Sequence, residues 1–154
     1  MTTHTWIYTL SQNISAETRQ ALGAAFQAFL NAWKTHGTPV KGAISIQYDR
    51  FVIVQADPAD DKPSGCSIDS MRHAVEEILQ QARLQWLDNG QVAFRASSGE
   101  IETVPFQQVP SLLAEGRLNP ETVVFDNSLS HTDDLAMWER PLAETWMKRY
   151  LVSQ

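Results

Sequence analysis

The sequence predicts an α+β protein built from a ferredoxin-like β-α-β-β-α-β layer and a small C-terminal α/β extension. Segments with the two-residue alternation of strands occur at residues 5–10 and 44–48. Two longer segments carry apolar residues at helical spacing, as helices do that lie on a sheet. Helices gathered on one face of an antiparallel sheet form such a layer, and a Ser-Ser-Gly stretch at 97–99 marks where the extension begins.

The first strand is expected at residues 5–10, where Trp6, Tyr8 and Leu10 share one face. A helix follows from about Ser15, which is a good N-cap. Gly and Pro at positions 37 and 39 end this helix. Its apolar stripe consists of Leu22, Phe26, Phe29, Leu30 and Trp33.

A hairpin is the clearest local signal. Residues 44–48 alternate between apolar and polar side chains, and Asp49-Arg50 is expected to form the turn. Residues 51–56 return as a nearly continuous apolar run, which suits a central strand covered on both faces.

A second helix is expected from about residue 67 to 83, with its apolar residues on one face. A strand at 91–95 then completes the layer. The chain is therefore expected to divide into a ferredoxin-like subdomain, 1–96, and a small subdomain with a helical tail, 97–154, packed on the first.

Two strands are expected in the extension, at residues 101–104 and 122–125. Between them Pro110 suits the first position of a short helix, and Gly116 suits the position just past its end. The tail is expected to be helical from about residue 133 and to start a new helix at Pro141.

Composition limits the function classes. The 154 residues carry a net charge of −6, which argues against nucleic-acid binding through phosphate neutralisation and against a polybasic membrane-surface protein. One cysteine excludes an intrachain disulfide and an all-cysteine metal site. No leader-like start and no apolar run of membrane-spanning length is visible, so we expect a cytoplasmic protein without membrane insertion.

Cys66 stands at the start of the second predicted helix, where the positive end of the helix dipole favours a thiolate. Asp69 and His73 fall on the polar face of that helix, so these three residues are the candidate catalytic groups of a thiol site. Seven helical positions separate Cys66 from His73 by about 10.5 Å along the axis. A direct Cys–His dyad therefore needs another histidine, and the candidates are His4, His36 and His131.

The alternative for this segment is a structural loop-to-helix cap. Gly65 then supplies the turn, Cys66 packs as a small apolar residue, and Ser67 caps the helix. The preceding loop carries Asp57, Asp60 and Asp61 without calcium-loop spacing, so we expect a solvated loop rather than a cation site.

Common cofactor and nucleotide motifs are absent from the sequence. It contains no G-x-x-x-x-G-K-[ST] loop and neither G-x-G-x-x-G nor G-x-S-x-G, so a P-loop ATPase is excluded and no cofactor is expected. The four histidines lack H-x-x-x-H spacing, so no metal site is expected either.

Five tryptophans are many for this length. Trp33 belongs to the stripe of the first helix and is expected in the core. Trp138 and Trp146 either pin the C-terminal helices to the sheet or line a contact surface. Together with Arg50 in the hairpin turn, they are the candidate binding residues.

A set of short motifs follows one order along nearly the whole chain: Trp6-Ile7-Tyr8, Phe29-Leu30-x-x-Trp33-x-x-His36-Gly37, Tyr48-x-x-Phe51, Ser64-Gly65-Cys66-Ser67-Ile68-Asp69 and Trp146-x-x-Arg149-Tyr150. In these motifs the sequence resembles a family of small uncharacterised bacterial proteins that often carries the label "ABC transporter ATPase". The label implies nucleotide hydrolysis, but the required motifs are missing here.

A second pattern covers the C-terminal third and consists of Gly99, Pro105-Phe106, Leu112-Leu113, Gly116, Pro120-x-Thr122-x-Val124 and Trp138-x-x-Pro141. In these positions the chain resembles GYF-like adaptor modules, which fold as a small sheet with a helix and are associated with protein–protein contacts. The Gly-Tyr-Phe signature itself is absent, and the stretch 126–134 is longer and more polar than that pattern expects.

Three functions remain open at this point. The first is a non-catalytic binding or interaction protein, with a protein partner or a second copy covering part of its surface. The second is a thiol-dependent enzyme or redox-sensitive protein centred on Cys66, with Asp69, His73 or Arg50 nearby. The third is a small-molecule-binding domain that uses a cleft between the sheet and the C-terminal segment.

Overall fold

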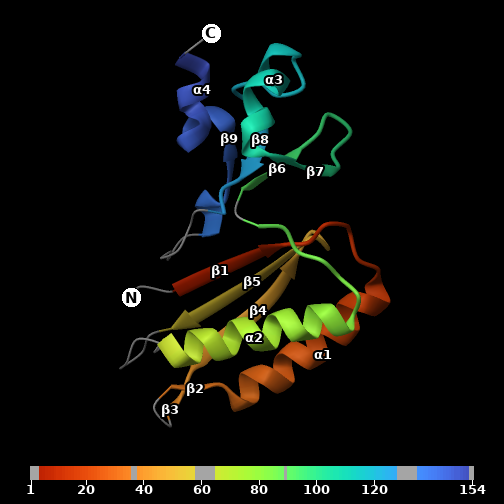
Figure 1. Ribbon diagram of the computed structural model, residues 1–154, viewed down its shortest axis with the longest axis vertical. Coiled ribbons are helices and arrows are strands. Elements are labelled where there is room, and N and C mark those ends of the chain that lie inside the picture. Colours follow the sequence, from red (N-terminus) through yellow and green to blue (C-terminus); the bar gives the residue numbers. More distant parts are fainter. Residues whose placement is uncertain (1–3, 36–37, 58–64, 89, 128–134, 153–154) are drawn as a thin grey trace. The chain divides into compact units, whose positions relative to one another are not determined.

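The computed structural model confirms an α+β fold in which helices accompany antiparallel sheets. The chain forms two compact units, Met1–Leu87 with Ser130–Asp133, and Asp88–Leu129 with Asp134–Gln154. The units therefore meet in sequence at Leu87–Asp88 rather than at the expected 96/97. The structure describes residues 4–35, 38–57, 65–88, 90–127 and 135–152 (Figure 1).

The first unit contains a three-stranded antiparallel sheet in the order β1-β5-β4. Its strands are β1 (His4–Thr9), β4 (Lys41–Gln47) and β5 (Phe51–Asp57). The apolar return strand of the predicted hairpin thus lies at the centre of the sheet, paired with both neighbours. Its apolar run reflects this position, because a central strand leaves no edge to solvent.

Helices α1 (Ala16–Ala32) and α2 (Gly65–Gln81) pack against this sheet and against each other (Figure 1). The side chain of Ser15 accepts a hydrogen bond from the Thr18 amide, which makes it the N-cap that the sequence predicts. The predicted stripes of both helices enter one core, whose fully buried members include Leu22, Phe26, Val52, Val54, Met71, Val75 and Leu79.

A short hairpin that the sequence analysis missed connects α1 to β4. It consists of β2 (Lys34–Thr35) and β3 (Thr38–Pro39). Trp33 ends α1 in an extended conformation, and its carbonyl accepts a hydrogen bond from the Val40 amide at 2.9 Å. Its indole Nε1 donates to the Ser67 carbonyl at 3.0 Å, so Trp33 joins the end of α1 to the start of α2.

The turn between β4 and β5 lies one residue earlier than expected. Tyr48 and Asp49, rather than Asp49 and Arg50, occupy its centre, with φ angles of 55° and 54°. The Arg50 amide donates to the Gln47 carbonyl, and the Arg50 carbonyl accepts from the Leu10 amide at 2.8 Å. Arg50 is therefore already paired with the first strand and is not available as a turn centre.

The predicted fourth strand of the layer belongs elsewhere. Residues Gln91–Arg95 form β6, which pairs within the sheet of the second unit. Just past the end of β1, the described residues form an isolated antiparallel bridge between Leu10 and Trp86. A tight turn joins β6 to its sequence neighbour, and the small entropy cost of closing such a short loop favours this local pairing.

The second unit contains a four-stranded antiparallel sheet in the order β7-β6-β8-β9. The other strands are β7 (Ile101–Pro105), β8 (Val123–Phe125) and β9 (Glu139–Pro141). The Ser-Ser-Gly stretch, expected to separate two subdomains, instead forms the β6–β7 turn, where Gly99 adopts a φ of +89°.

The tail departs most from the expectation. It contains β9 and short turns of 3₁₀-helix, Leu135–Met137, Leu142–Glu144 and Trp146–Lys148, before the four-residue α4 (Arg149–Val152). A helix from residue 133 was therefore the wrong prediction, because β8 needs a partner on its free edge and Glu139–Pro141 supplies it. Pro141 fits as the last residue of that strand.

Helix α3 (Val109–Ala114) forms where expected, although Pro110 takes its second rather than its first position. Gly116 follows the helix with a φ of +80°, as predicted. A separate core lies beneath these elements, made by Val92, Phe94, Val109, Leu112, Leu118, Val124, Leu142 and Met147. Among the described residues no helix is both long and apolar enough to cross a membrane.

Candidate functional site

The described residues do not bring the three candidate groups of the predicted thiol site together. Cys66 is the second residue of α2, and its side chain lies outside the described part of the structure. Asp69 and His73 are exposed on α2, and His73 Nε2 lies 3.8 Å from Glu77 Oε2, one turn further along the helix. His36 and His131 also lie outside the described residues, and His4 stacks on Trp6 in β1.

No metal centre is visible in the described ranges, where no three His, Cys, Asp or Glu side chains gather. Of the three loop aspartates, Asp57 ends β5, whereas Asp60 and Asp61 lie outside the described residues.

Arg50 supports the fold rather than lining an open surface. Its buried guanidinium donates to the Leu10 carbonyl at 2.7 Å, and to the Ser11 carbonyl and Asn13 Oδ1, both at 3.3 Å. Burial lowers the pKa of this guanidinium. Arg50 directly precedes β5, whereas α2, which carries the predicted thiol site, follows the other end of that strand in the chain.

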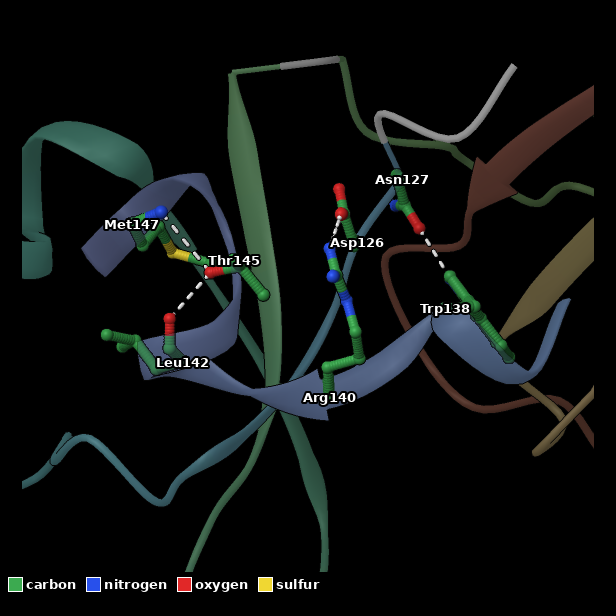
Figure 2. Close-up of polar contacts among 7 residues, drawn as sticks. All are labelled: Asp126, Asn127, Trp138, Arg140, Leu142, Thr145 and Met147. Atoms are coloured by element: carbon green, nitrogen blue, oxygen red, sulfur yellow. Dashed lines mark hydrogen bonds and ion pairs between the residues drawn. The ribbon is translucent and has the colours of Figure 1, made fainter. Parts of the chain in front are cut away.

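Trp138 is likewise buried in the second unit. Its indole Nε1 donates to Asn127 Oδ1 at 2.8 Å (Figure 2). Its ring packs on Phe125, with the two ring centroids 4.9 Å apart. The Trp138 carbonyl accepts from the Asp126 amide, which extends the pairing of β8 and β9. Trp138 therefore pins the end of the sheet and is not a contact residue.

A charged pair that the sequence analysis missed lies beside Trp138. Arg140 Nη2 contacts Asp126 Oδ2 at 2.5 Å, with the Asp126 side chain only 5% exposed (Figure 2). Arg140 stands opposite Val124 on β8, so the register brings its side chain to the strand's end. The pair crosses between β8 and β9, which holds the short outer strand in place.

Trp146 differs from the other two candidates because its side chain is 40% exposed. The ring of Phe106 lies 6.3 Å from it and the ring of Tyr150 6.0 Å, both edge-on. The guanidinium of Arg149 stands 5.3 Å from the Trp146 ring and 5.2 Å from the Tyr150 ring. We call these four residues the Trp146 cluster.

The backbone beneath the cluster is fixed by its neighbours. Thr145 Oγ1 donates to the Leu142 carbonyl at 2.8 Å and accepts from the Met147 amide at 3.2 Å (Figure 2). Leu142 and Met147 are buried in the core of the second unit. A buried residue on each side of a capped turn thus holds Trp146 at the surface.

The cluster combines apolar rings with polar groups at their edges. Arg149 Nη2 lies 3.3 Å from the Tyr150 hydroxyl, and its stacking on both rings restricts the side chain. Such a surface can bury apolar area against a partner and also donate hydrogen bonds. The groups that the cluster presents are three aromatic rings, one hydroxyl and one guanidinium.

Sequence reasoning found Trp146 but not its role as the centre of a cluster. The available signal was spacing, since residues 146 and 150 are four apart and neighbour each other on one turn of helix. Phe106 could be added only by the fold, because it lies 40 positions earlier in the chain.

Comparison of the chain with protein-family models, curated proteins and solved structures found no match.

Proposed function

We propose that the protein is a non-catalytic binding protein that contacts a protein partner through the Trp146 cluster. The observation that carries the proposal is the exposed indole of Trp146, framed by Phe106 and Tyr150 and stacked by Arg149. Trp, Tyr and Arg are the residues that dominate binding energy at protein interfaces. An aromatic ring left partly in water gains free energy when a partner covers it.

The resemblances support this proposal without adding to its geometry. GYF-like modules are associated with protein–protein contacts, and the cluster lies in the part of the chain that resembles them. Membership of the bacterial family and a cytoplasmic location belong to the same proposal.

We also propose that the first unit is a ferredoxin-like layer. The fourth strand of such a layer pairs with the first strand, and here the Leu10–Trp86 bridge, at the end of β1, stands in its place.

The test is site-specific photocrosslinking of the full chain in cells, with a benzophenone amino acid in place of Trp146. Met137 is the matched control position, because it is an exposed large apolar residue of the same unit. We expect a discrete crosslinked protein from position 146 and none from 137. Binding of the purified pair should weaken about 30-fold in Trp146→Ala, as for a residue at the centre of an interface. Equal crosslinking at both positions would contradict the proposal.

A thiol-dependent role for Cys66 is the second candidate, and its position in the first turn of α2 keeps it testable. On the proposal above, Cys66→Ser should bind the crosslinked partner as tightly as the wild type, because Cys66 lies in the other unit. Alkylation of Cys66 followed against pH gives an independent measurement. A reaction midpoint well below that of a free thiol would favour the thiol-dependent role.

A further inference from the structure

The Trp146 cluster lies on segments whose charge differs from that of the whole protein. The chain has a net charge of −6. The two segments that supply the cluster, 103–114 and 145–152, contain no Asp or Glu, and the second contains Lys148 and Arg149, both exposed. The local charge at a surface, rather than the net charge of the chain, determines which partner fits it.

The guanidinium of Arg149 is the polar centre of the cluster. It lies over the rings of Trp146 and Tyr150, 5.3 and 5.2 Å from their centroids. A guanidinium is planar, so when it stacks on a ring its N–H groups point along the ring surface and not into it. Its Nη2 lies 3.3 Å from the Tyr150 hydroxyl, and within the described part of the chain this is the one hydrogen bond that Arg149 makes.

No carboxylate of the described residues neutralises Arg149. None of their ion pairs includes Arg149 or Lys148, and Glu144, the nearest acidic residue in sequence, pairs with neither. Arg117 is different, because it is also exposed in this unit but lies 3.6 Å from Glu102. Arg149 therefore retains N–H donors for a carboxylate that comes from outside the described chain.

The rings of the cluster add an apolar requirement. The side chain of Trp146 is 40% exposed, and Phe106 and Tyr150 stand edge-on to it and are half-buried. A partner gains free energy by covering this indole with an apolar side chain. It gains more when a carboxylate beside that side chain accepts hydrogen bonds from Arg149, because such pairs are charge-assisted and often bidentate.

We propose that the partner of the Trp146 cluster is a protein segment in which acidic and apolar side chains are neighbours, an inference that rests on the proposed function. An apolar side chain of the segment packs on Trp146, and the carboxylate of an adjacent Asp or Glu pairs with Arg149. Lys148 adds an attraction of longer range from the same segment of the chain. Charge complementarity thus selects an acidic partner for a surface of an acidic protein.

The probe is a capped peptide, acetyl-Gly-Glu-Leu-Glu-Leu-Glu-Gly-amide, compared with the same peptide carrying Gln in place of each Glu. Both are titrated into the isotope-labelled full chain, and NMR follows the Trp146 indole N–H signal, which is assigned by its loss in Trp146→Phe. We expect the Glu peptide to bind about fivefold more tightly than the Gln peptide.

Arg149→Gln should reduce this preference to less than about twofold, because only the weaker field of Lys148 then remains. Arg117→Gln is the matched control, since it removes an exposed arginine of the same unit that already pairs with Glu102. It should keep the preference for the Glu peptide.

Three results would overturn the inference. One is equal affinity for the two peptides, or no shift of the indole signal with either at about 1 mM, the limit of a weak complex. Another is an equal loss of the preference in Arg149→Gln and Arg117→Gln. The third is a dimer, seen by sedimentation, that shifts the same indole signal, because a second copy would then be the occupant.

Crosslinking from position 146 distinguishes this failure from failure of the proposed function. It needs no particular charge on the partner. A discrete crosslinked protein together with equal peptide affinities would overturn the acidic partner alone, whereas loss of the crosslink would overturn the proposed function and this inference with it.

Discussion

Trp146 and Met147 are neighbours in the chain with opposite environments, 40% and 1% exposed respectively. Both follow Thr145, which caps this turn of 3₁₀-helix, and the turn directs the Trp146 side chain to solvent and the Met147 side chain into the core. A binding residue and a packing residue thus stand side by side, and their roles can be told apart by the free energy of unfolding.

We expect Met147→Ala to lower that free energy by about 2–5 kcal/mol, because it removes a buried side chain and leaves a cavity. Trp146→Ala should change it by less than about 1 kcal/mol, as exposed positions do. Urea unfolding of both variants measures the difference. A large loss in Trp146→Ala would make its ring part of the core and weaken its assignment to binding.

Tyr8 is the residue whose ionisation the fold changes most clearly. Burial raises the pKa of its phenol to about 12, the nearby Glu76 carboxylate adds to this rise, and Arg72 opposes it. The folded state therefore holds the phenolic proton more tightly than the unfolded chain does. The stability that Tyr8 contributes is complete below its ordinary pKa of 10.0 and is lost as the pH rises through about 12.

An alkaline titration checks this expectation. Tyrosinate absorbance should show one late phase near pH 12 that disappears in Tyr8→Phe. The same variant should lose less stability than the wild type between pH 10 and 12. Tyr48→Phe, at an exposed tyrosine, serves as the control and should retain the late phase. A late phase that survives in Tyr8→Phe would assign it to another group.

At the scale of elements, β9 depends on the Asp126–Arg140 pair and on Trp138. A strand of three residues makes few ladder bonds, so its side chains must add to them. The Asp126 carboxylate is buried beside Arg140, whose Nε atom is itself buried without a hydrogen-bond partner in the described structure. Removing the carboxylate would leave this guanidinium with fewer partners still.

We expect Asp126→Asn to cost about 1–3 kcal/mol of unfolding free energy, with faster hydrogen exchange in β8 and β9. The exposed pair of Glu102 and Arg117, at 3.6 Å, is the matched control. Glu102→Gln should cost less than about 1 kcal/mol, since exposed pairs contribute little. Equal losses in the two variants would show that the Asp126 pair does not hold β9.

At the scale of the whole molecule, the two units carry two separate cores. Leu79 is fully buried in the first and Leu142 in the second, and no residue is shared between the two clusters as described. Regions with their own apolar contacts open as separate cooperative units in native proteins. The same substitution can therefore be made in each core and its effect mapped.

We expect Leu79→Ala to accelerate amide exchange in β1, β4 and β5, and Leu142→Ala to accelerate it in β6, β8 and β9. Each should destabilise its own unit by about 2–5 kcal/mol. Hydrogen–deuterium exchange with peptide-level mass spectrometry makes the measurement. Acceleration throughout the chain in both variants would show a single cooperative unit instead.

Short-range patterns in the sequence determined most of the elements. Apolar spacing predicted α1, α2 and six of the strands, Ser15 predicted a cap, and Gly116 predicted the end of α3. These features depend on residues a few positions apart, so the chain shows them directly. Strand β9 was missed for the same reason, because a three-residue segment ending in proline has no pattern of its own and forms only against β8.

Only the tertiary structure decided which sheet each strand joins and which candidate residues reach a surface. Residues 91–95 were correctly expected as a strand, yet they pair in the second unit. The sequence did not distinguish the three candidate binding residues. Long-range contacts bury Arg50 and Trp138 and leave Trp146 exposed. Strand order and exposure depend on contacts between residues far apart in sequence, and neither periodicity nor spacing reports those contacts.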